Sequence, residues 1–177
     1  EKKKIISGLK KILALAENGK LKWSVDFEDV HMNIENALVS VIGDVGKKIH
    51  LGRSRNDLVA TDLRLYLRDF IDLYIDQLRD IQFVLANVAI KHSDSLFPGF
   101  THMQVAQPVT FGHHLLAWCE MIHRDELRLL NNRESINIMP LGSAALSGTS
   151  LKLNRSMVAK SLGFKSVTKN SMDAVSD

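Results

Sequence analysis

Residues 53–97 contain neither proline nor glycine and read RSRNDLVATDLRLYLRDFIDLYIDQLRDIQFVLANVAIKHSDSLF. Apolar residues recur here at intervals of three or four, which is the spacing of one face of an α-helix. The residues on this face are Leu63, Leu67, Phe70, Tyr74, Leu78, Ile81, Leu85 and Val88. We therefore predict one helix over residues 54–91, about 57 Å long at 1.5 Å per residue. That length is typical of a long bundle or coiled coil.

Further apolar residues lie outside this face, among them Leu65, Ile71 and Phe83. A helix that is apolar on several faces needs several neighbouring helices. A chain of 177 residues supplies few of them. We therefore expect helices from other subunits to cover the remaining faces, and predict an obligate oligomer.

The rest of the chain also favours helices. Periodicity predicts helices over residues 5–17 and 26–42, and another that begins at Pro108 or just after it and ends before Pro140. A short helix is predicted between Asn154 as N-cap and Gly163 just past its end. Residues 43–57, 92–107 and 141–150 are expected to be loops. Because no stretch alternates convincingly as a β-strand, we predict an all-α fold.

Composition narrows the classes of function. Lys and Arg total 23 and Asp and Glu total 20, giving a net charge of +3. The two signs are mixed along the chain, whereas nucleic-acid binding usually needs a clustered basic face. No apolar run approaches the roughly 18 residues that span a bilayer. The single cysteine excludes an intrachain disulfide and a cysteine zinc cage, and fits a reducing, cytoplasmic compartment.

Two polar loops hold candidate functional residues. Residues 50–57, HLGRSRND, combine two arginines, an asparagine and an aspartate. Guanidinium groups bind carboxylates in bidentate geometry. The plainer interpretation is a solvated helix start with Ser54 as N-cap and Asp57 in the first turn; the two are compatible, because a helix N-terminus also favours anions.

Residues 98–108, PGFTHMQVAQP, are the second loop. A histidine in a loop can titrate near neutral pH and transfer protons, although such a residue is often only a surface side chain. The histidine pair at 113–114 lacks the spacing of a zinc motif, so no metal site is predicted. Cys119 is expected in the core.

Two shorter segments have alternative interpretations. Asp29 and His31 precede or start a predicted helix, where they could supply an N-cap and first-turn charge or belong to a functional site. Residues 140–149, PLGSAALSGT, offer small residues and backbone N–H groups that could approach an anion, or form a tight turn between helices.

Taken together, five segments resemble the argininosuccinate lyases of the fumarase/aspartase superfamily. They are EDVHMNIE, HLGRSRNDLVATDLRLYLR, GFTHMQVAQPVTFGHHLLAW, INIMPLGSAALSGT and NSMDAVSD, in that order over residues 25–177. The resemblance implies a tetramer-forming long-helix bundle. Residues 1–52 would end an N-terminal helical domain, and residues 53–177 would begin the central bundle. It also implies a central piece of a longer chain, inactive alone because the GSS-x-MP-x-K-x-N signature follows NSMDAVSD.

The implied reaction splits argininosuccinate into arginine and fumarate by β-elimination, without a cofactor. The resemblance assigns proton transfer to His102 and expects each active site to combine segments of three subunits of a homotetramer. Its alternatives are a non-enzymatic, crystallin-like homologue and a sister lyase of the superfamily. The substrate-binding residues that it implies are Asp29, Arg55, Asn56, Thr101 and Gln104.

Three positions depart from the family's pattern. Leu51 stands where threonine is usual, Val105 where a basic residue is usual, and Ala144 where glycine is usual. The changes at Leu51 and Ala144 are expected to adjust packing. The change at Val105 removes a charge beside the predicted histidine.

Overall fold

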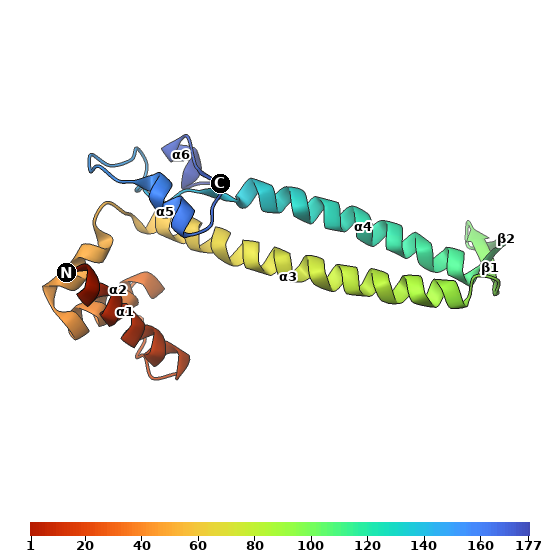
Figure 1. Ribbon diagram of the computed structural model, residues 1–177, viewed down its shortest axis with the longest axis horizontal. Helices are drawn as coiled ribbons and strands as arrows, with labels where there is room; N and C mark the ends of the chain where they lie inside the picture. The colour runs from red at the N-terminus through yellow and green to blue at the C-terminus, as the bar shows by residue number, and fades with distance from the viewer. The chain divides into compact units, whose positions relative to one another are not determined.

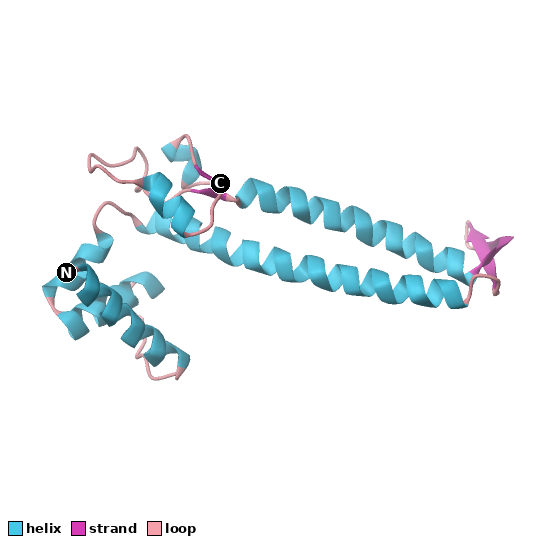
Figure 2. Ribbon diagram, in the orientation of Figure 1, coloured by secondary structure: helices cyan, strands magenta, loops and turns pink.

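The computed structural model describes residues 1–177, which divide into two compact units. Unit 1 contains residues 1–61, 140–158 and 168–177, and unit 2 contains residues 62–139 and 159–167. Helices dominate the chain (Figure 2), which confirms the predicted all-α class. The domain boundary expected between residues 52 and 53 stays a prediction.

The N-terminal part of unit 1 is a helical cluster. Helix α1 (Lys2–Glu17) packs on α2 (Val30–Ile42), and the 3-10 helix η1 (Asp44–His50) follows in a segment predicted as loop. Ile12, Leu38 and Ile42 form the buried core between them. Helix α2 begins at Val30 rather than at residue 26, because the Asp29 carboxylate caps it by accepting the Met32 N–H at 2.7 Å.

Two long helices form most of unit 2. Helix α3 (Arg55–Lys91), whose first two turns belong to unit 1, confirms the helix predicted over residues 54–91. Helix α4 (Phe111–Ile136) lies beside it (Figure 1). Arg133 pairs with Asp72, and Arg79 Nη2 lies 2.7 Å from Glu126 Oε1. The pair nearer the start of α3 is nearer the end of α4, so the two helices are antiparallel.

The helix pair leaves much of its apolar surface exposed. On α3 only Ile71, Ile75 and Ala89 are buried among the apolar residues of unit 2. Tyr66, Phe70 and Tyr74 stack along one exposed face, with ring centroids 6.1 and 5.7 Å apart. Exposed large apolar residues on the two helices also include Leu63, Leu73, Ile81, Phe83, Val84, Ile90, Leu116, Trp118, Met121, Leu127 and Leu130.

A β-hairpin joins the two long helices, so the absence of strands predicted for residues 92–107 is wrong. Strand β1 (Leu96–Thr101) pairs antiparallel with β2 (Gln104–Thr110) (Figure 2). The register shifts between Pro98 and Phe100. Pro108 itself belongs to β2, and helix α4 begins at Phe111, shortly after Pro108 as predicted. The Thr110 hydroxyl caps it by accepting the His113 N–H at 3.1 Å.

The chain returns after α4 through short elements. In unit 2, β3 (Ile138–Met139) pairs in parallel with β4 (Ser166–Val167), a second small sheet that was not predicted. Helix α5 (Arg155–Ser161) has the predicted N-cap, since Asn154 Oδ1 accepts the Met157 N–H at 2.9 Å. Gly163 follows its end with a φ of 70°. In unit 1, Asn170 caps α6 (Ser171–Ala174).

Candidate functional site

Arg55, the first residue of α3, lies between two carboxylates in unit 1. Its Nη1 is 2.5 Å from Glu28 Oε2 and 3.3 Å from Asp29 Oδ2. Asp29 therefore has two functions, because its Oδ1 caps α2 while its Oδ2 contacts the guanidinium. Glu28 was not predicted, and its position directly before Asp29 was the available signal.

The pKa values of this group reflect its pairing. Burial disfavours the charged form of Asp29, but the Met32 N–H and the Arg55 guanidinium outweigh it, and the pKa of Asp29 is lowered. The hydrogen bond that Arg55 donates to the Glu28 carboxylate raises the pKa of Arg55, with Asp29 adding to it. Both groups are thus ionised at neutral pH, and the charged guanidinium of Arg55 is the group that can bind a carboxylate.

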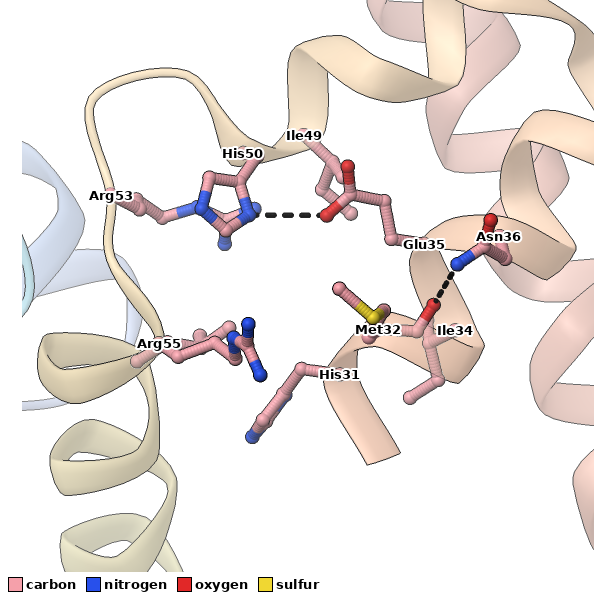
Figure 3. Close-up of a pocket in the computed structure, with 10 residues that line it drawn as sticks. His31, Met32, Ile34, Glu35, Asn36, Ile49, His50, Arg53 and Arg55 are labelled. Atoms are coloured by element: carbon pink, nitrogen blue, oxygen red, sulfur yellow. Dashed lines mark hydrogen bonds and ion pairs between the residues drawn. The ribbon is translucent and has the colours of Figure 1, made fainter. Parts of the chain in front are cut away.

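A cavity of about 580 Å³ opens beside Arg55. Figure 3 shows the side chains of His31, His50 and Arg55 around the same opening, with Glu35 facing His50 across it. His50 Nδ1 lies 3.1 Å from Glu35 Oε2. The guanidinium groups of Arg53 and Arg55 favour an anionic ligand, and an arginine fork suits a carboxylate. The cavity is also lined by Met32, Ile34, Asn36, Ile49, Arg53 and Leu58.

Asn56 and Asp57 follow Arg55 and connect to the loop after Pro140. The Asn56 amide Nδ2 donates to the Ala145 carbonyl oxygen at 3.4 Å. Asp57 is fully buried, and its Oδ1 accepts the Ser54 N–H at 2.9 Å, as its predicted place in the first turn of a helix requires. Its Oδ2 accepts the N–H groups of Gly142 and Ala144 at 2.8 and 2.9 Å, two bonds that were not predicted.

The hairpin of unit 2 carries the other predicted residues at its tip. Thr101 pairs with Gln104, which leaves His102 and Met103 as the two turn residues. Their φ angles are 51° and 62°, in the left-handed region that normally favours glycine or asparagine. Thr101, His102 and Gln104 are all exposed. No side-chain hydrogen bond within the chain holds any of them, so all three are available to a ligand or to another subunit.

The predicted site residues thus form two groups. Asp29, Arg55 and Asn56 lie in unit 1, and Thr101, His102 and Gln104 lie in unit 2. No three His, Cys, Asp or Glu side chains are grouped so that they could hold a metal ion. No helix has both the length and the apolar character that crossing a bilayer demands.

The whole chain matches a family of known proteins. A family model described as Lyase matches residues 1–177. The chain belongs to this lyase family. The argininosuccinate lyase of Ruthia magnifica is 53% identical over 177 residues, which are 100% of this chain and 37% of that protein. The argininosuccinate lyase of Bordetella avium is 56% identical over 170 residues, or 96% of this chain and 36% of that protein. The predicted resemblance is therefore confirmed.

Two solved structures share the fold of this chain. A crystal structure of EDDS lyase in complex with formate has a TM-score of 0.86 and 34% identity, and covers 97% of this chain and 33% of that one. A fumarate lyase:delta crystallin from Brucella melitensis, bound to cobalt, shares the fold with a TM-score of 0.69 at 19% identity, over 81% of this chain and 35% of that one. This lyase chain spans about 37% of the length of the curated relatives it matches.

Proposed function

We propose that this chain is part of an argininosuccinate lyase, which converts argininosuccinate to L-arginine and fumarate. The observation that carries the proposal is the identity of 53–56% to curated argininosuccinate lyases over 96–100% of the chain. EDDS lyase, which belongs to the same superfamily, is 34% identical in sequence to this chain. The whole protein's activity is assigned here as a proposal, because the chain spans about 37% of those relatives.

The reaction is a β-elimination that needs no redox step. A base removes a proton from the carbon beside a substrate carboxylate, and the electron pair forms the double bond of fumarate. The carbon–nitrogen bond then breaks, and an acid protonates the departing guanidino nitrogen of arginine. Such chemistry needs donors for the carboxylates and the developing oxyanion, together with groups that move protons. We therefore propose that no cofactor and no metal takes part.

Each predicted residue has a place in this scheme. Arg55 and Asn56 bind substrate through their guanidinium and amide groups, with Asp29 beside them. Arg55 already lies 2.5 Å from one exposed carboxylate, that of Glu28, which supports its ability to bind another. Thr101 and Gln104 bind substrate from the hairpin, and His102 transfers a proton. His102 lies at the exposed tip of the hairpin, where a ligand can reach its imidazole.

We propose that the protein is a homotetramer whose active sites combine residues of three subunits. The exposed apolar faces of α3 and α4 support this, since packing against other copies would bury them. The exposed hairpin tip supports it too, because its three polar side chains lack partners within the chain. The two groups of site residues would then meet from different chains.

We place the protein in the cytoplasm, with no nucleic-acid or membrane partner. The single cysteine, Cys119, is free, and free thiols are typical of reducing compartments. The mixed charge and the net charge of +3 do not favour a nucleic-acid surface.

The test uses the full-length protein that carries residues 1–177. Purified protein is incubated with argininosuccinate, and the release of fumarate and arginine is measured in equal amounts. Release at a rate typical of enzymes supports the proposal. Activity on another N-substituted aspartate alone would assign a sister lyase instead. A folded protein that acts on neither substrate would leave the crystallin-like structural role.

A further inference from the structure

We propose that Asp57 is a positioning residue for substrate binding, which acts through Asn56 by fixing the loop at residues 140–145. The inference rests on the proposed lyase function. Asp57 does not face the cavity beside Arg55; its carboxylate is fully buried and accepts only backbone N–H groups within unit 1.

The two carboxylate oxygens of Asp57 contact different segments. Oδ1 accepts the N–H of Ser54 at 2.9 Å, in the RSRND segment that carries Arg55 and Asn56. Oδ2 accepts the N–H of Gly142 at 2.8 Å and of Ala144 at 2.9 Å, more than eighty residues later in the chain. One buried charge therefore fixes the start of α3 and the loop relative to each other. Charge-assisted bonds of this kind are stronger than neutral ones.

Arg155 also holds this loop. Its Nε donates to the Leu141 carbonyl at 2.9 Å, and its Nη2 to the Pro140 carbonyl at 3.3 Å and the Ser143 hydroxyl at 3.2 Å. An anion thus binds the N–H groups of the loop, and a cation binds its carbonyl groups. We call this arrangement the loop clamp, consisting of Asp57, Arg155 and residues 140–144.

The loop clamp holds the chain in a conformation that alanine rarely adopts. Ala144 has a φ of 56°, in the left-handed region. Two N–H groups directed at one buried carboxylate oxygen, those of Gly142 and Ala144, account for this conformation. Strain of this type persists where the surrounding contacts determine it, and it is common at functional sites.

The link from the loop clamp to the site is Asn56. Its Nδ2 donates to the carbonyl of Ala145, the residue that follows Ala144. This bond directs one side of the amide, while the carbonyl oxygen of the amide and its second N–H stay open to a ligand. If the loop moved, Asn56 would lose this bond and with it the fixed orientation of its amide.

The test is a double-mutant cycle in the full-length protein. Asp57→Asn keeps the shape of the side chain but replaces one acceptor oxygen by an NH2 group, which leaves buried N–H donors unpaired. We expect a loss of about tenfold to a hundredfold in kcat/KM, the scale of a small misplacement of a binding group. In the Asn56→Ala background, we expect Asp57→Asn to lower kcat/KM by less than about twofold, because the Asn56 amide through which Asp57 acts on the substrate is already absent.

The matched control is Glu126→Gln, which also changes a buried, bonded carboxylate to an amide, but in unit 2 and at a residue that is not among the predicted site residues. We expect it to lower the thermal unfolding midpoint without changing kcat/KM by more than about twofold. If Asp57→Asn does not fold, Arg155→Lys replaces it in the same cycle, because lysine lacks the guanidinium fork that holds the loop.

The outcomes are distinct. A coupled loss for Asp57→Asn, with an unaffected control, supports the inference. Full activity in Asp57→Asn, or an equal loss in both backgrounds, would overturn it. An inactive wild-type protein counts against the proposed function instead. In that case the inference about Asp57 is tested by amide hydrogen exchange. The amides of Gly142 and Ala144 should exchange faster in Asp57→Asn than in wild type, and unchanged exchange would overturn it.

Discussion

The two groups of site residues differ in how the chain supports them. In unit 1, Arg55 lies between two carboxylates, and Asp57 is buried with three N–H partners. At the hairpin tip of unit 2, His102 and Met103 adopt positive φ angles, and Met103 is 96% exposed. The first group is preorganised by its own chain. The second group has few internal contacts, and we expect it to be completed by another subunit.

The largest expected effect is at the hairpin. His102→Asn should lower kcat by about 10²- to 10⁴-fold, the usual contribution of a proton-transferring group, with little change in stability because the side chain is exposed. Steady-state kinetics and thermal unfolding of the full-length protein measure both. His113→Asn is the matched control, an exposed histidine at the start of α4 that should retain wild-type kcat. Equal activity in both variants would remove His102 from the mechanism.

The next largest effect is at Arg55 in unit 1, and it is expected in KM rather than in kcat. Arg55→Lys keeps the charge but loses the fork that binds a carboxylate, so KM should rise by about tenfold or more. The control is Arg128→Lys, where the arginine pairs with Asp125 within the exposed surface of α4. A lower kcat at unchanged KM would instead show that Arg55 acts only in the transition state.

A smaller effect concerns stability in unit 1. Ala144→Gly should stabilise the protein by about 1 kcal/mol, since glycine adopts a φ of 56° without strain. Thermal unfolding should show a higher midpoint. Ala145→Gly, at the next residue, has no positive φ to relieve and should give no gain. A lower midpoint for Ala144→Gly would show that the methyl group contributes more by packing than it costs in strain.

The smallest effect is a pH dependence at Asp29. Its pKa is lowered in the folded chain, so its contribution to stability is complete above the ordinary Asp value of about 4 and is lost as pH falls through the lowered pKa. Asp29→Asn retains the N-cap but not the charge. The two proteins should therefore differ in unfolding midpoint at pH 7 and converge as the pH falls below the lowered pKa of Asp29. A difference that is the same at both pH values would exclude the ionic contribution.

Local signals predicted much of the fold. The absence of proline and glycine over residues 53–97, with apolar spacing of three and four, predicted α3 to within one residue of its start. Asn154 and Gly163 predicted the cap and the end of α5. These features depend on backbone chemistry within a few residues, which the sequence displays directly.

The hairpin was missed because its residues do not show the usual signals. Pro98 and Pro108 interrupt the alternation of β1 and β2, and the turn uses His102 and Met103 rather than asparagine and glycine. The first-turn role of Asp57 was predicted, but its bonds to Gly142 and Ala144 arise from tertiary contacts that no local pattern encodes. The site residues themselves came from the family resemblance, and their roles stay predictions.

Hybrid tetramers test the central claim most directly. Full-length Arg55→Ala and His102→Asn variants, each expected to have strongly reduced activity alone, are unfolded together and refolded as a mixture, and fumarate release from argininosuccinate is measured. If the two groups meet from different subunits, some sites in the hybrids combine an intact Arg55 with an intact His102, and activity returns well above that of either variant refolded alone. A mixture that forms hybrids but stays as inactive as its components would contradict the account.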